Sequence, residues 1–86
     1  MRVVADHARS STFAVGDRVV PSNVGRGYVL RRIMRRAMLH GQRLGLEKGF
    51  FERMVPVVVE TMKEIYPELV DGETHIRKVI ASEEEA

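Results

Sequence analysis

The sequence predicts an all-α domain, a small bundle of four to five helices, and three observations support this prediction. Apolar residues recur at helical intervals along nearly the whole chain. In residues 26–44, apolar and arginine side chains fall on opposite arcs when placed at about 100° per residue. Prolines and glycines divide the 86 residues into four or five segments.

The first predicted helix covers residues 2–15. Its small and apolar residues lie at helical intervals: Val3, Val4, His7, Ala8, Ser11, Ala14 and Val15. Gly16 and Asp17 end this helix, and residues 21–25 form a rigid loop that begins with Pro21.

The second predicted helix covers residues 26–44, with Gly41 and Gly45 near its end. Its inner arc consists of Val29, Leu30, Ile33, Met34, Ala37 and Met38. Its opposite arc consists of Arg31, Arg32, Arg35, Arg36 and Arg43.

A third helical stretch covers residues 47–65. Its inner face consists of Val55, Val58, Val59, Met62 and Ile65. Pro56 predicts a kink or a break into two helices, because proline lacks the donor N–H and clashes with the preceding turn. Pro67 ends the stretch, and Asp71 is expected to cap a last helix that continues through Ile76, Val79 and Ile80. Because that helix reaches the last residue without a stop signal, we expect residues 1–86 to be a domain cut from a longer chain.

The composition restricts the classes of function. There is no cysteine, and His7, His40 and His75 lie too far apart to match a metal-ligand spacing, so no metal site is expected. No nucleophile, phosphate-binding or metalloprotease motif occurs, so no catalytic residue is expected. The apolar runs are short and no signal-peptide pattern is present, which predicts a cytoplasmic protein without a membrane partner.

Charge is distributed unevenly along the chain. Residues 1–43 hold nine Lys or Arg and two Asp or Glu, whereas residues 44–86 hold five and ten. The arginine arc suits phosphate oxygens, since guanidinium groups present a planar fork of donors. Two alternatives stay open: ion pairs between these arginines and the acidic half, and a solvated surface.

The loop before the arginine helix carries polar side chains that suit base recognition. Asn23 offers both a donor and an acceptor, and Pro21 limits the backbone. A short polar side chain on a stiff loop can reach base edges in the wide minor groove of A-form RNA. The alternative is that Ser22 or Asn23 caps the following helix.

Two elements of the chain resemble the segment that follows the catalytic core of bacterial alanyl-tRNA synthetases. The first is ADH-x-RS, formed by Ala5, Asp6, His7, Arg9 and Ser10. The second is PSN-x-x-RGYVLRRI-x-RRA at residues 21–37, a long and specific element. The resemblance extends over residues 2–86.

The resemblance implies a helical domain that binds the acceptor stem of the alanine tRNA and reads its G·U wobble pair. It implies that Asn23 is one of two recognising side chains, the other being an aspartate beyond residue 86. Arg31, Arg32, Arg35 and Arg36, with Arg26 as a weaker candidate, would then hold the tRNA backbone.

For the parent enzyme, the resemblance implies ligation of alanine to tRNA with ATP and Mg²⁺ in a neighbouring catalytic domain, and zinc in an editing domain. No cofactor is expected in the segment itself. Two other functions remain open: a structural module that braces the catalytic domain, and an independent helical nucleic-acid-binding protein.

Overall fold

The computed structural model describes residues 2–85, which form helices joined by turns and contain no strand. The helices are α1 (Arg2–Gly16), α2 (Gly25–Arg43), the single-turn α3 (Phe50–Arg53), α4 (Val55–Met62) and α5 (Glu68–Glu85). The all-α prediction is confirmed. No helix within the described residues is both long and apolar enough to cross a membrane.

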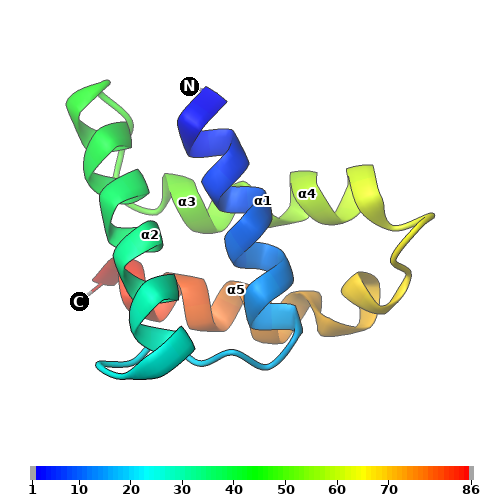
Figure 1. Ribbon diagram of the computed structural model, residues 1–86. Helices are drawn as coiled ribbons and strands as arrows, with labels where there is room; N and C mark the ends of the chain where they lie inside the picture. Colours follow the sequence, from blue (N-terminus) through cyan, green and yellow to red (C-terminus); the bar gives the residue numbers. More distant parts are fainter. Residues whose placement is uncertain (1, 86) are drawn as a thin grey trace.

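Helix α1 packs against three of the other helices in the described part of the chain. In Figure 1, α3 and α4 follow one another and α5 runs back alongside them, while α1 crosses this layer. Helix α1 contacts α2, α4 and α5, and α5 also contacts α2. The end of α5 therefore lies near α2, although the two are distant in the sequence.

The core lies where the apolar faces of these helices meet. Phe51, Met34, Ile76 and Ile80 are its largest fully buried side chains. From α1 the predicted Val4, Ala8, Ser11 and Val15 are all buried, together with Thr12, whose hydroxyl donates to the Ala8 carbonyl oxygen at 2.8 Å. The helical spacing of the sequence thus located most of the α1 core.

The predicted break near Pro56 is confirmed, two residues earlier than the proline itself. Helix α3 ends at Arg53 and α4 begins at Val55, so Pro56 is the second residue of α4. Proline is tolerated there because the first N–H groups of a helix have no intrahelical acceptor.

The prediction that Asp71 caps the last helix is wrong. Helix α5 begins at Glu68, directly after Pro67, which places Asp71 within the first turn. The acidic side chains of Glu68 and Asp71 there face the positive end of the helix dipole. Nor does Pro67 end α4, which stops at Met62.

Three residues assigned to inner faces are exposed instead: Val3, Val29 and Ile65. Val3 and Val29 each precede a fully packed neighbour by one residue, about 100° around the helix, and so lie at the margin of the apolar arc. Ile65 lies in the turn after α4 and is 70% exposed, because the helix that would have turned it inward has already ended.

Candidate nucleic-acid interface

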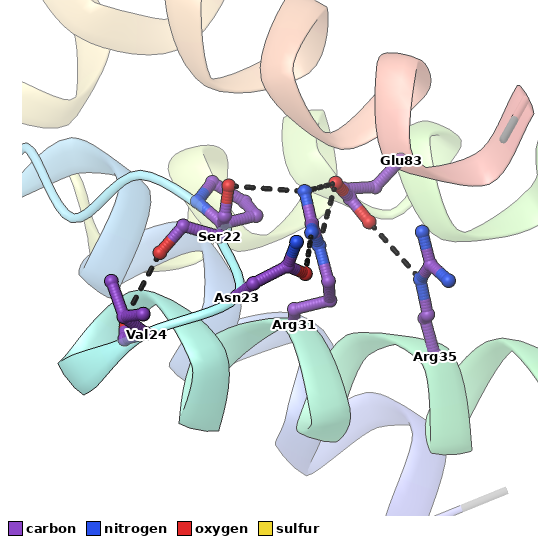
Figure 2. Close-up of polar contacts among 7 residues, drawn as sticks. Ser22, Asn23, Val24, Arg31, Arg35 and Glu83 are labelled. Atoms are coloured by element: carbon purple, nitrogen blue, oxygen red, sulfur yellow. Dashed lines mark hydrogen bonds and ion pairs between the residues drawn. The ribbon is translucent and has the colours of Figure 1, made fainter.

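Residues 21–23, here called the corner, connect α1 to α2 and carry the candidate base-reading side chain. Pro21 is buried, and the amide of Ser22 donates to the Gly27 carbonyl oxygen at 3.1 Å. The Ser22 hydroxyl donates to the Val24 carbonyl oxygen at 3.0 Å (Figure 2). These contacts hold the corner against the first turn of α2.

Gly27 permits the close contact between the corner and α2. A Cβ atom at this position would lie 2.1 Å from the Val20 carbonyl oxygen and 2.2 Å from the Ser22 hydroxyl. Helix α2 begins at Gly25, whose φ is 60°. The close approach at Gly27 was not predicted, because it depends on where residues 20–22 fold back.

Asn23 does not cap α2. The N-cap residue is Val24, and no side chain makes a capping hydrogen bond there. The exposed Asn23 side chain accepts a hydrogen bond at its Oδ1 from Arg31 Nη1 at 2.8 Å (Figure 2). The capping alternative is therefore wrong for Ser22 and Asn23 alike. The NH₂ group of Asn23 donates no hydrogen bond to any group within residues 2–85.

Two of the candidate arginines pair with a carboxylate at the end of α5. Arg31 Nη2 lies 2.9 Å from Glu83 Oε1, and Arg35 Nε lies 3.3 Å from Glu83 Oε2 (Figure 2). The Glu83 side chain is only 10% exposed, so it needs these cations to offset its lost hydration. The ion-pair alternative thus describes Arg31 and Arg35 in the structure. Their contact with tRNA phosphates stays a prediction.

Three other candidate arginines are exposed: Arg26, Arg32 and Arg36. No carboxylate within the described part of the chain forms an ion pair with them. The guanidinium of Arg32 lies 5.8 Å from the centre of the Tyr28 ring, a cation–π arrangement that leaves N–H groups available at its edge. Because Arg32 and Arg36 are four residues apart on α2, they lie on one face about one helical turn apart.

The conspicuous residues of the first motif make local contacts. Asp6 lies 3.7 Å from both Arg2 and Arg9, and the ring of His7 bonds through Nδ1 to the Val3 carbonyl oxygen at 2.9 Å. His7 is thus engaged within its own helix. No group of three or more His, Asp or Glu side chains within residues 2–85 is placed to hold a metal ion.

Sequence reasoning missed Glu83 as an individual residue. The acidic half was recognised as a source of ion-pair partners, but nothing in the sequence distinguishes Glu83 from its neighbours Glu84 and Glu85. The helical phase of α5 would have been the usable signal, because only one of three consecutive residues can face α2.

The described residues thus form a helical domain that combines an exposed amide with three exposed guanidinium groups that form no ion pair within residues 2–85. The sequence model of the family described as tRNA synthetases class II (A) matches residues 1–86. The chain belongs to this family.

Within this family, similar proteins are alanine–tRNA ligases. That of Saccharophagus degradans is 58% identical over 85 residues, which is 99% of this chain and 10% of that protein. That of Pediococcus pentosaceus is 56% identical over 84 residues, 98% of this chain and 10% of that protein. That of Leuconostoc citreum is 53% identical over 83 residues, 96% and 9% respectively. These relatives are aminoacyl-tRNA synthetases, hence enzymes, and the chain spans about a tenth of their length.

Proposed function

We propose that residues 1–86 are the acceptor-stem recognition domain of an alanine–tRNA ligase, and that Asn23 reads the G·U wobble pair of its tRNA. The observation that carries this proposal is the state of Asn23. It is exposed, it caps nothing, and its amide is held at a fixed orientation beside a basic helix. The identity of about 52–58% with alanine–tRNA ligases supports the choice of tRNA.

The chemistry of Asn23 suits the minor groove of a G·U pair. Such a pair leaves the guanine amino group without a pairing partner, and the second lone pair of Asn23 Oδ1 can accept from it. The free amide NH₂ can donate to a base oxygen or to a ribose hydroxyl in the same groove. By analogy with good base contacts on DNA, this recognition is worth about 1–3 kcal/mol in discrimination.

Phosphate contacts would come from the outward face of α2. Arg32 and Arg36 are exposed and free of carboxylates within the described residues, and they lie on the helix that follows the corner. Phosphate contacts position the protein on the RNA without reading sequence, so this face would set the register in which Asn23 meets the pair.

Other domains of the parent enzyme would carry out the chemistry. A neighbouring catalytic domain would bind ATP, Mg²⁺ and alanine, an editing domain would hold zinc, and the enzyme would act in the cytoplasm. Residues 1–86 would supply no catalytic group to the ligation of alanine or to editing. Their contribution would be the choice of tRNA.

Replacing Asn23 with alanine in the intact ligase is expected to lower kcat/KM for the cognate tRNA by about 5- to 150-fold, the equivalent of 1–3 kcal/mol. Alanine activation, measured by alanine-dependent ATP–pyrophosphate exchange, should be unchanged. The matched control is Gln42→Ala, which removes an exposed amide from the far end of α2. Equal loss of charging and activation would indicate a folding defect and contradict the assignment.

Replacing Arg32 and Arg36 together with glutamine is expected to weaken binding to G·U and G·C stems alike. The slope of log K against log salt concentration should become shallower by about 1 for each arginine, because each releases the counterions of one phosphate. Lys63→Gln, at a cation directly after α4 that pairs with Glu60, is the control and should leave the slope unchanged.

A bracing role is the second candidate, favoured by the exposed apolar side chains of Val29 and Leu39 on α2. If the outward face of α2 instead docks on the catalytic domain, the Arg32 and Arg36 replacements will reduce alanine activation. A salt slope of tRNA binding equal to that of the wild type, combined with reduced alanine activation, would favour bracing over RNA contact.

A further inference from the structure

We infer that Arg31 is a positioning residue, which fixes the orientation of the Asn23 amide and does not contact phosphate. The inference rests on the proposed role of Asn23 and assigns Arg31 a different task from Arg32 and Arg36. It follows from how the five N–H groups of the Arg31 guanidinium are used.

Four of these five donors are occupied inside the protein. Nε and Nη2 donate to Glu83 Oε1 at 3.2 and 2.9 Å, and Nη2 also donates to the Pro21 carbonyl oxygen at 3.2 Å. Nη1 donates to Asn23 Oδ1 at 2.8 Å. One N–H of Nη1 remains, which is too few for the two parallel bonds by which arginine grips a phosphate.

The same contacts determine which atoms of Asn23 are presented to a ligand. Arginine only donates hydrogen bonds, so the Asn23 atom that faces it must be Oδ1 and not Nδ2. The amide is thereby prevented from turning over, and Oδ1 is the Asn23 atom bonded to the guanidinium (Figure 2). Without Arg31 the side chain of Asn23 would sample both orientations and lose affinity through the entropy of ordering.

Glu83 anchors the guanidinium from the side of α5. Its carboxylate lies between Arg31 and Arg35 and is almost fully covered, so the Arg31 fork is held between two helices and the corner. The Arg31 side chain itself is 26% exposed. A rigid group that connects α5 with Pro21 and Asn23 of the corner is suited to hold the Asn23 amide in a fixed position, as precise recognition sites require.

The decisive variant is Arg31→Lys in the intact ligase. Lysine keeps the positive charge, but its ammonium is a single point of donors that cannot reach Glu83, Pro21 and Asn23 together. We expect the ratio of kcat/KM for G·U over G·C tRNA to fall about ten-fold. The salt slope of binding and the rate of alanine activation should match those of the wild type, which excludes loss of a phosphate contact and misfolding.

The matched variants separate the possible outcomes. Arg32→Gln should lower the salt slope and preserve the G·U preference. The double variant Asn23→Ala with Arg31→Lys should discriminate no worse than Asn23→Ala alone, because Arg31 acts through Asn23. If Asn23→Ala lowers discrimination but Arg31→Lys does not, or if the two losses add, the positioning role is refuted while the proposed function stands. If Asn23→Ala itself leaves discrimination intact, the proposed function fails first.

Discussion

Replacing Glu84 with alanine is expected to lower the free energy of unfolding of the chain by about 2–4 kcal/mol. Its carboxylate accepts hydrogen bonds from three backbone N–H groups at the start of α3. These are the N–H groups of Gly49 at 3.1 Å, Phe51 at 3.0 Å and Glu52 at 3.0 Å. Hydrogen bonds to a charged group contribute about 1.5–3 kcal/mol each, and partial relaxation keeps the total below their sum.

The cause of this large effect is that α3 has no cap of its own. Gly49 is its N-cap residue and carries no side chain, so the first N–H groups of the helix depend on a carboxylate from the end of α5. Loss of that carboxylate leaves them without partners beside the buried Phe51. The contact also joins the start of α3 to the end of α5.

Urea denaturation of the wild type and three variants would measure the effect. Glu85→Ala is the matched control, because the Glu85 side chain is 79% exposed and lies 3.9 Å from Lys48, a surface pair of little energetic value. Glu84→Gln should be intermediate, since the amide keeps one acceptor oxygen but turns an NH₂ toward a donor. Equal stability of the Glu84 and Glu85 variants would contradict the assignment of Glu84 as the cap of α3.

Much of the fold was predictable because helical periodicity is a local property of the sequence. The spacing of Val4, Ala8 and Val15 predicts the buried face of α1 without reference to the partner helices. The start of α5 was not predictable in the same way. Both Asp71 and Pro67 are acceptable near a helix start, and the choice between them depends on how the turn after α4 packs.

The candidate site likewise has a part that was predictable from local sequence and a part that depends on tertiary contacts. Asn23 and the arginines were found because their residue types and spacing suit RNA, and the resemblance singled out Asn23. Which arginine faces inward was not predictable, because it depends on Glu83, fifty-two residues away from Arg31, arriving beside α2. Tertiary contacts of this kind assign different tasks to side chains that look equivalent in the sequence.

Replacing Gly27 with alanine is expected to abolish the preference for the G·U pair as completely as Asn23→Ala does, although Gly27 touches no RNA in the proposed complex. The added methyl group would lie 2.1 Å from the Val20 carbonyl oxygen. The Ser22 hydroxyl can rotate away, but the carbonyl belongs to the backbone, so the corner must shift by about 1 Å to restore an ordinary contact. Such a shift breaks the Ser22 to Gly27 hydrogen bond and moves Asn23 relative to Arg31.

Gly72→Ala is the matched control for this variant. Its added methyl group would lie 3.8 Å from Ile76, an ordinary contact, and alanine should stabilise α5 by up to about 1 kcal/mol. Gly27→Ala should instead destabilise the chain by about 1–3 kcal/mol, as overpacked sites do. With alanine activation as the measure of folding, Gly27→Ala should spare activation and the salt slope while losing discrimination. If it keeps the G·U preference, the corner tolerates displacement, and recognition does not depend on where the backbone holds Asn23.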